Sequence, residues 1–466
     1  MSTAKAVLSA TENRSLGDDL AASATRKAGW LILVGALIAA LACFWHVDRF
    51  WPAYLVAFVY VLSISLGALF FVIVQHLVRA GWSVAVRRVA EGLAWNVRFL
   101  WLLFLPLVWG IAQGHLMPVA GLHWAEHHGA AAAHGDPTSG GKLHGAAEGE
   151  GPHRSEAEPH PEALQGTGSL EGPASPWSEG PHLEGVAHGA LSAGKEAWLS
   201  FPWVMARMVI YFVIWIGLAW YYRKTSIAQD TDPDPKYTLR MARFSAPAMI
   251  LYALSTSLVG FDLLMALDPY WFSTIFGVYF FAGCFLSAMA SIILVLTLLQ
   301  RNGRLTESVT PEHFHDVGKF MFAFVVFWAY IAFSQYMLIW YANIPEETGW
   351  FLIRQTGDWK WIGVTLILGH FALPFFLLLS RFPKRRPGLL VVGAIYILAV
   401  HFVDLFWIVQ PQKSPLGHMP VPLLDVFLCV AMIGLYVVFT AKSLQGAALI
   451  PTGDPRLAES LSHENY

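Results

Sequence analysis

Charged side chains and cysteines are both scarce in this sequence of 466 residues. Only 13% of the residues are charged, against about a quarter in an average soluble domain, which excludes an ordinary soluble fold. The three cysteines, Cys43, Cys284 and Cys429, lie in apolar stretches without CxxC or CxxCH spacing. Iron–sulfur clusters, c-type haem and a disulfide framework are therefore disfavoured. The net charge is −2 and the basic residues are scattered, which argues against a nucleic-acid partner.

Apolar and aromatic residues are abundant instead. Hydrophobic residues make up 56% of the chain, which contains 20 Trp and 31 Phe; amphipathic rings gather at membrane interfaces. A span needs about 20 mostly apolar residues. We therefore expect an all-α polytopic membrane protein with about ten transmembrane helices. The expected spans are Trp30–His46, Tyr54–Leu77, Phe99–Ala112, Pro202–Tyr221, Pro247–Leu267, Thr274–Leu299, Met321–Tyr341, Ile362–Leu379, Leu389–Ile408 and Leu424–Thr440.

The basic residues predict the orientation of these spans. With spans counted from the N-terminus, 22 of the 30 Lys and Arg residues fall on the side of both termini. Because positive charge is retained on the cytoplasmic side, we expect both termini to be cytoplasmic. The apolar run after Lys27 also allows a signal-peptide interpretation, with Cys43 after a cleavage site. Acidic residues in the long preceding segment favour a retained helix.

The chain therefore divides into five expected parts. Residues 1–27 form a cytoplasmic segment, 28–112 the first three spans, 198–445 the other seven, and 446–466 a cytoplasmic tail. Residues 113–197 form an outer loop that is rich in His, Glu and Gly and contains ten of the 18 histidines. Its composition buries too little apolar surface to offset the entropy of ordering, so we expect it to be mobile. It fits a proton-buffering or metal-collecting segment, but the irregular His spacing favours a low-complexity insertion.

Two aspartates in the expected spans occupy matching positions. Asp262 precedes Pro269 by the same seven positions as Asp404 precedes Pro411. An even number of spans separates them, so their helices run in the same direction. This spacing suggests a duplication into two four-helix bundles, spans two to five and six to nine, with two flanking helices.

Ionisable residues within membrane spans are functional candidates by default. His401 lies one turn before Asp404 on the same helix face, and His370 is expected at a similar depth, so these three are candidates for a proton pathway. Asp262 with Arg207 is the corresponding pair in the other bundle, and a structural ion pair explains it equally well. His76, at the inner end of the second span, is a further candidate. For a single buried histidine, a hydrogen-bonded core residue is the commoner outcome.

Two long segments, Tyr252–Tyr279 and Lys319–Glu347, carry a family resemblance. They resemble the ActF subunits of bacterial alternative complex III, a quinol:cytochrome c oxidoreductase. The resemblance covers the membrane portion and leaves the His-rich insertion outside its pattern. It implies a polysulfide-reductase-type (NrfD-like) subunit of ten helices in the bacterial cytoplasmic (inner) membrane, without redox centres of its own.

The resemblance also implies partners and cofactors. The complex would contain a related quinol-binding NrfD-like subunit, an iron–sulfur subunit, multihaem and monohaem cytochromes c, small membrane subunits, and menaquinol or another quinol. Haem c and iron–sulfur clusters would belong to the partners. Although this family is described as quinone-binding, the chain supplies no electron acceptor, so we expect the working quinol site in the related subunit and leave quinone binding here open. Two other readings remain: a b-type cytochrome anchor with haem between His370 and His401, and a secondary transporter.

Overall fold

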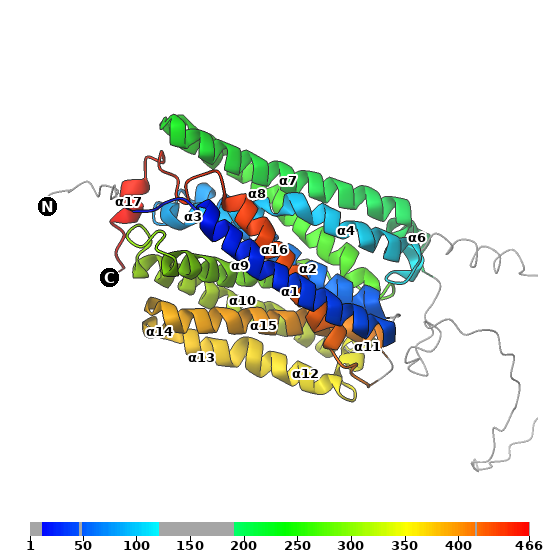
Figure 1. The fold of residues 1–466 in the computed structure, drawn as a ribbon. Helices are drawn as coiled ribbons and strands as arrows, with labels where there is room; N and C mark the ends of the chain where they lie inside the picture. Colours follow the sequence, from blue (N-terminus) through cyan, green and yellow to red (C-terminus); the bar gives the residue numbers. More distant parts are fainter. Residues whose placement is uncertain (1–11, 46–48, 121–190, 415–416, 466) are drawn as a thin grey trace, which may run out of the picture.

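The computed structural model describes residues 12–45, 49–120, 191–414 and 417–465, and these residues are predominantly helical (Figure 1). Most of the expected outer loop, from 121 to 190, lies outside the described residues. Ten helices or helix pairs are long and apolar enough to cross a membrane. The expected all-α polytopic membrane fold with ten spans is therefore confirmed at this level.

Ten helical units account for these spans. They are α1 (Asp18–Trp45), α2 (Phe50–Leu77), α3 with α4 (Val84–Trp95 and Val97–Ala112), α7 (Phe201–Thr231), α8 (Pro235–Leu263), α9 (Phe276–Arg301), α10 (Pro311–Ala342), α12 with α13 (Trp359–Thr365 and Leu373–Leu379), α15 (Pro387–Val409) and α16 (Leu423–Leu444). The shorter elements are α6 (Ala193–Leu199), α11 (Pro345–Gln355), α14 (Arg381–Arg385), α17 (Leu457–Leu461) and the single turns η2 (Pro118–Ala120), η3 (Met265–Leu267) and η5 (Gln410–Lys413).

The long helices pack in two adjoining sets. In the first, α2 contacts α4, α4 contacts α7, α7 contacts α8, and α8 contacts α2. In the second, α9, α10, α13 and α15 contact one another in the same circular order. The helices α2 and α9 join the two sets, and α1 packs along α16 outside them (Figure 1).

A small residue permits the close approach of α2 and α9. The Cα of Gly67 lies so near the partner helix that a Cβ there would be 2.0 Å from the carbonyl oxygen of Cys284 and 2.7 Å from the Cβ of Ala288. Small residues of this kind allow membrane helices to pack backbone against backbone. A side chain at position 67 would therefore separate the two sets.

The third span differs from its expected extent. It begins at Val84 instead of Phe99, and it consists of two helices that meet at Asn96. The amide of Asn96 donates to Thr440 Oγ1 at 2.8 Å and accepts from Ser443 Oγ at 2.8 Å, both on α16. These side-chain bonds hold the junction against α16, so α3 belongs to the packed core although its sequence reads as a charged connection.

Both ends of the described chain lie at one end of the bundle (Figure 1). The carboxylate of Glu12 accepts hydrogen bonds from the backbone N–H groups of Glu307 and Ser308, both at 2.8 Å, in the connection between α9 and α10. At the other terminus, His463 Nε2 lies 2.6 Å from Asp316 Oδ2 near the start of α10. We call this end, formed by residues 12–17 and 451–465, the terminal face.

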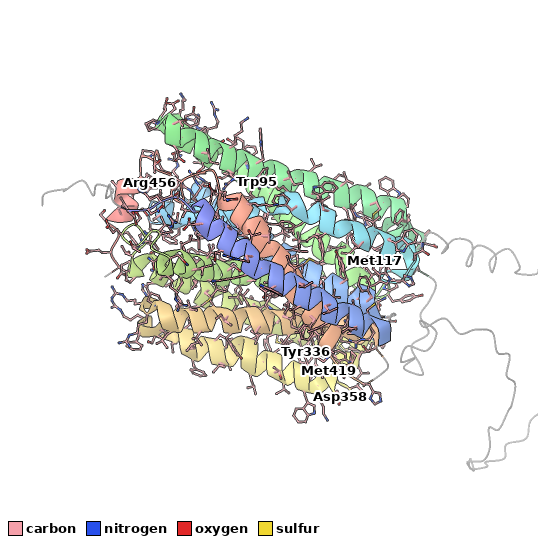
Figure 2. The ribbon with its side chains drawn as sticks, in the orientation of Figure 1. Trp95, Met117, Tyr336, Asp358, Met419 and Arg456 are labelled. Carbon is pink, nitrogen blue, oxygen red and sulfur yellow. The ribbon has the colours of Figure 1, made fainter. Side chains whose placement is uncertain are left out.

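The opposite face contains the other set of connections. Asp358, which precedes α12, accepts a hydrogen bond from the backbone N–H of Met419 at 3.2 Å. Figure 2 shows these two residues at the end of the molecule away from Arg456 on the terminal face. The contact joins the start of α12 to the connection between α15 and α16.

A buried arginine fixes α11 against α15. The guanidinium of Arg354 donates to the carbonyl oxygens of Trp407, Ile408 and Trp350 at 3.1, 2.6 and 2.8 Å, and it lies 3.3 Å from the centroid of the Trp350 ring. Burial lowers the pKa of this guanidinium well below its ordinary value, while the negative charge of Asp268 acts in the opposite direction. Arg354 thus bonds three carbonyls, one of them in its own helix and two at the end of α15.

Candidate functional site

The carboxylate of Asp404 is buried between three helices of the second set. Asp404 lies on α15. Its carboxylate accepts one hydrogen bond from the hydroxyl of Tyr279 on α9 and another, at 3.2 Å, from Trp328 Nε1 on α10. Only 2% of Asp404 is exposed, and no Lys or Arg forms an ion pair with it among the described residues. Neutral dipoles alone therefore solvate this carboxylate, and a buried negative charge without a cation is costly.

Two buried histidines complete what we call the Asp404 cluster, which consists of Asp404, His401, His370, Tyr279, Trp328 and Ser63. His401 Nε2 lies 2.9 Å from Ser63 Oγ on α2. The ring of His370 packs against Trp328 with centroids 3.9 Å apart. His370 and Asp404 thus both contact Trp328. His401 lies one turn from Asp404, as the sequence predicts.

Three imidazole nitrogens in this cluster lack a hydrogen-bond partner among the described residues. They are both nitrogens of His370 and Nδ1 of His401. Buried polar atoms usually bond a protein group or an ordered water. The unpartnered nitrogens therefore mark positions where the cluster has capacity to bind water or a transferable proton.

A local irregularity in the eighth span presents His370. Pro374 has no N–H group and cannot donate to the carbonyl four residues earlier, which is that of His370. The helix adjusts by forming a π-helical segment, η4 (Leu366–Ala372), in which the N–H of Leu373 donates to the carbonyl of Leu368. Single π-helical turns in α-helices are frequent at functional sites, and this one contains the candidate histidine.

Asp262 has a different environment from Asp404 despite its matching position. Arg207 on α7 donates to both oxygens of Asp262 on α8 at 2.8 Å, and the hydroxyl of Tyr211 donates to Oδ2 at 2.9 Å. The Arg207 guanidinium also lies 4.0 Å from the ring centroid of Trp198 on α6. The geometry is a bidentate buried ion pair, so the structural role considered for Arg207 is present.

Serine hydroxyls extend from the Asp404 cluster along α9. Ser63 Oγ lies 3.4 Å from Ser287 Oγ, and Ser291 Oγ donates to the Ser287 carbonyl at 2.8 Å one turn further toward the terminal face. All three residues are buried. They form a short polar row within an otherwise apolar contact between α2 and α9.

His76 lies apart from the Asp404 cluster. It is 13 positions after Ser63 on α2, about 20 Å along the helix axis, and its ring stacks on Tyr222 with centroids 5.4 Å apart. A cavity of about 210 Å³ borders His76 near the terminal face, with Arg87 and Asp454 in its wall. His76 Nε2 has no hydrogen-bond partner among the described residues. The structure therefore separates this candidate from the other histidines.

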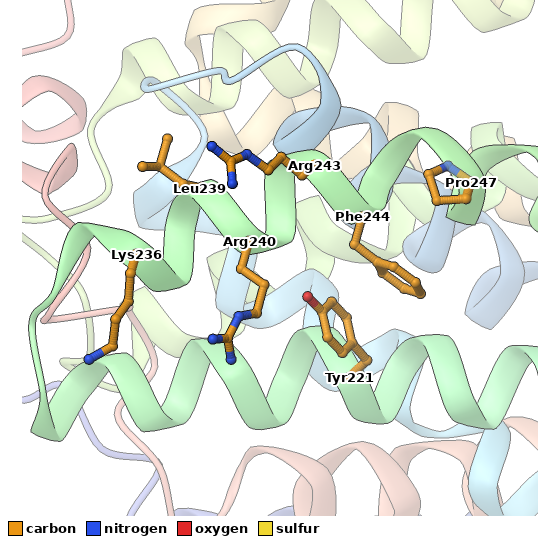
Figure 3. A pocket seen from close by; sticks show the side chains of 7 residues that line it. All are labelled: Tyr221, Lys236, Leu239, Arg240, Arg243, Phe244 and Pro247. Carbon is orange, nitrogen blue, oxygen red and sulfur yellow. The ribbon is translucent and has the colours of Figure 1, made fainter.

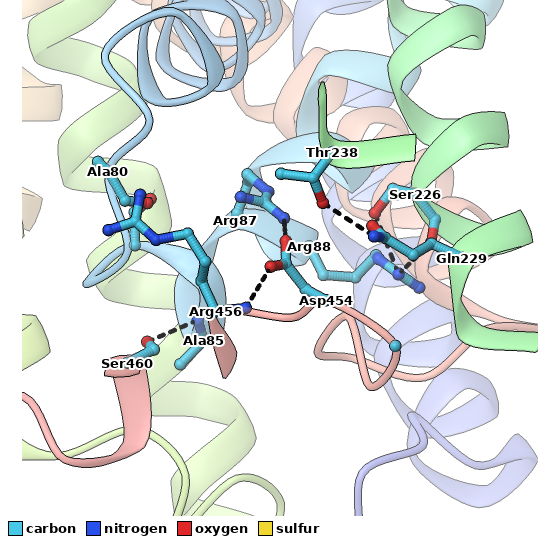
Figure 4. A network of polar contacts seen from close by, with 12 residues as sticks. Ala80, Ala85, Arg87, Arg88, Ser226, Gln229, Thr238, Asp454, Arg456 and Ser460 are labelled. Carbon is cyan, nitrogen blue, oxygen red and sulfur yellow. Dashed lines mark hydrogen bonds and ion pairs between the residues drawn. The ribbon is translucent and has the colours of Figure 1, made fainter. Parts of the chain in front are cut away.

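A buried charged network borders that cavity through Arg87 and Asp454 (Figure 4). Arg87 on α3 pairs with Asp454 of the C-terminal segment, and Arg88 pairs with Asp230 on α7 at 2.9 Å. Glu91 lies 3.1 Å from Arg88 and 3.6 Å from Arg87. These charges look like a solvated connection in the sequence, but they join α3, α7 and the C-terminal tail at the terminal face.

The cluster was only partly accessible to sequence reasoning. The i, i+3 spacing predicts that His401 and Asp404 share a helix face, whereas the sequence does not single out Tyr279, Trp328 and Ser63, because such residues are common in apolar spans without a chemical role. Among the residues described in the structure, no group of three or more His, Cys, Asp or Glu side chains could hold a metal ion. No protein-family model and no curated protein matches this chain.

Proposed function

We propose that this protein is an integral membrane subunit of a respiratory or photosynthetic quinol:electron-acceptor oxidoreductase of the alternative complex III type. The observation that carries the proposal is the Asp404 cluster, a buried carboxylate held only by neutral donors beside two histidines with unpartnered nitrogens. The resemblance of Tyr252–Tyr279 and Lys319–Glu347 to ActF subunits supplies the reaction class. The described histidines and aspartate supply a place to load and release a proton.

The cluster offers two directions for proton movement. Asp404 exchanges a proton with the opposite face, because it lies five residues from the end of α15. In the direction of the terminal face, His401 passes its proton through Ser63 toward Ser287. His401 Nε2 lies 2.9 Å from Ser63 Oγ, which lies 3.4 Å from Ser287 Oγ. Bound water at the free imidazole nitrogens completes the hydrogen bonds that the protein leaves open. The row ends well before His76, so the pathway requires additional water between Ser291 and the cavity at the terminal face, which begins at Gln75 and His76.

Electron transfer belongs to the partner subunits in this proposal. A related NrfD-like subunit oxidises the quinol and passes electrons to the iron–sulfur subunit and the multihaem and monohaem cytochromes c. Protonation of the Asp404 cluster then follows from a change in helix packing in this chain, since no electron enters it. The two sets of helices are the proposed four-helix bundles, with α1 and α16 flanking them. The terminal face lies in the cytoplasm of a bacterial cell, and residues 113–197 lie outside.

The structure bears on the alternative of a haem between His370 and His401. Trp328 lies against His370 and Ser63 lies against His401 Nε2, so a porphyrin inserted between the imidazoles would displace both contacts. This packing favours the polar cluster. A haem b absorption spectrum from the purified protein would restore the cytochrome reading, and a stable lone protein that transports a solute would restore the transporter reading.

Replacement of Asp404 by Asn tests the proposal, because the amide keeps the shape and hydrogen bonds of the carboxylate but cannot ionise. The intact complex is purified, reconstituted in vesicles, and assayed for quinol oxidation and for protons released per electron. We expect assembly and quinol oxidation to persist while this ratio falls. The matched control is Trp328→Phe, which removes one donor and leaves the carboxylate. An Asp404→Asn complex with the wild-type ratio would show that Asp404 has only a structural role.

A further inference from the structure

A groove lined by basic side chains lies between α7 and α8 (Figure 3). It has a volume of about 520 Å³ and is bordered by Tyr221 of α7 and by Lys236, Arg240 and Arg243 of α8. Pro235 begins α8, and Arg240 follows it by five residues, which is about 8 Å along the helix. The groove is therefore at the end of two membrane-length helices, on the side of the terminal face.

The positive charge of this groove is only partly compensated. Lys236 forms ion pairs with Asp234 at 2.9 Å and Asp232 at 3.3 Å. By contrast, Arg240 and Arg243 form no ion pair or hydrogen bond with any described residue, and both are exposed. The two guanidinium groups extend to different sides of α8, Arg240 toward Tyr221 and α7, and Arg243 away from α7 (Figure 3). They leave planar donor sets available for an anion of the phosphate type.

The other wall of the groove is apolar. The rings of Tyr221 and Phe244 pack with centroids 4.4 Å apart, and Pro247 continues this wall away from the charges. Further along α8, Ile250 and Leu254 are 63% and 59% exposed. An apolar surface suited to a hydrocarbon chain thus follows directly after the cationic groups along α8.

We propose that this groove binds an anionic phospholipid of the leaflet next to the terminal face. Arg240 bonds its phosphate, the hydroxyl of Tyr221 donates a further hydrogen bond, and Arg243 adds positive charge from the other side of α8. One acyl chain lies along Phe244, Pro247 and Ile250. A lipid matches the groove better than free phosphate, because phosphate alone leaves the apolar wall uncovered. Basic pockets at the ends of membrane helices are well suited to such headgroups.

Native mass spectrometry of the full-length protein tests this site. The protein is equilibrated with equal amounts of phosphatidylglycerol and phosphatidylcholine, and the lipids retained are counted. The test variant is the double substitution Arg240→Gln and Arg243→Gln. The control is Arg381→Gln with Arg386→Gln, which removes two basic charges from α14 and its end. Both variants are checked for unchanged elution in size-exclusion chromatography.

The wild-type protein is expected to retain phosphatidylglycerol in preference to phosphatidylcholine. Each basic side chain near a membrane surface contributes about fivefold to the affinity for anionic lipid, so the test variant should bind phosphatidylglycerol about 25-fold more weakly. The control variant should keep the wild-type preference. An equal loss of phosphatidylglycerol binding in both variants would show that general surface charge causes the effect, and would overturn the proposal. Full retention of phosphatidylglycerol by the test variant would overturn it as well.

A second arm separates lipid from free anion. Inorganic phosphate is added at constant ionic strength, with chloride as the reference salt. Phosphate should displace no more phosphatidylglycerol than chloride does, because it lacks the acyl chain. Displacement by millimolar phosphate would show that the groove recognises a free anion, and the lipid assignment would be wrong.

Discussion

Removing one partner of the Arg207–Asp262 ion pair is expected to destabilise the protein more than removing both. The substitutions are Asp262→Asn, Arg207→Met and the two combined. With Asp262→Asn, the guanidinium keeps its charge but loses the bidentate acceptor that it now has at 2.8 Å. With Arg207→Met, a carboxylate that is 1% exposed keeps only the hydroxyl of Tyr211.

The expected magnitudes follow from the burial of the pair. Breaking a buried pair on one side leaves an unpaired charge and costs about 3–5 kcal/mol. The double variant has no buried charge at this position. It should lose only about 1–3 kcal/mol, because Tyr211 then donates to a neutral amide instead of a carboxylate.

Equilibrium unfolding in detergent micelles measures these differences through the free energy of unfolding. Trp198→Ala is the matched control, because it removes the ring that lies 4.0 Å from the Arg207 guanidinium and leaves the ion pair intact. A cation–π contact contributes about 0.5–2 kcal/mol, so the control should lose less than either single variant. Losses that simply add in the double variant would refute the reasoning, since they would show that the two charges do not depend on each other.

Three further predictions concern other contacts. Arg354→Lys should lower the free energy of unfolding by about 1–3 kcal/mol, because a point-like ammonium cannot reproduce the three bonds of the guanidinium fork; an unchanged denaturation midpoint would contradict this. Asp454→Asn should release the C-terminal segment from Arg87 and accelerate its proteolysis, measured by mass spectrometry of the cleaved tail, whereas equal cleavage rates would show that the ion pair does not hold it. Protease added to intact spheroplasts should cut within residues 113–197, and cutting only after lysis would reverse the proposed orientation.

The number of spans was predictable because it depends on the length of apolar runs. The start of the third span was not, since α3 contains Arg87, Arg88 and Glu91 and reads as a charged connection. The partners of the two arginines outside α3 are Asp230 and Asp454, both more than 100 positions away in the sequence. A charged stretch is compatible with burial only when such partners exist, and one sequence does not reveal them.

The candidate site shows the same limit at the level of single side chains. Helical spacing placed His401 beside Asp404, and matching depth in antiparallel spans brought His370 near them. The donors to Asp404 come from α9 and α10, and their selection depends on how each helix is rotated about its axis. The contrast between Asp262 and Asp404 has the same origin, because their repeated positions meet an arginine in one set of helices and aromatic donors in the other.

The pairing of α1 with α16 has a consequence for biosynthesis. These helices are the first and last membrane-length segments of the described chain, yet they pack along each other. Gly35 approaches α16 closely enough that a Cβ there would lie 2.7 Å from the backbone nitrogen of Ala431. About 400 residues are translated between the end of α1 and the end of α16, which takes roughly 20–80 s at 5–20 residues per second. During that interval α1 resides in the bilayer without its partner. The helices α1 and α16 therefore pack together only after the last span has been translated.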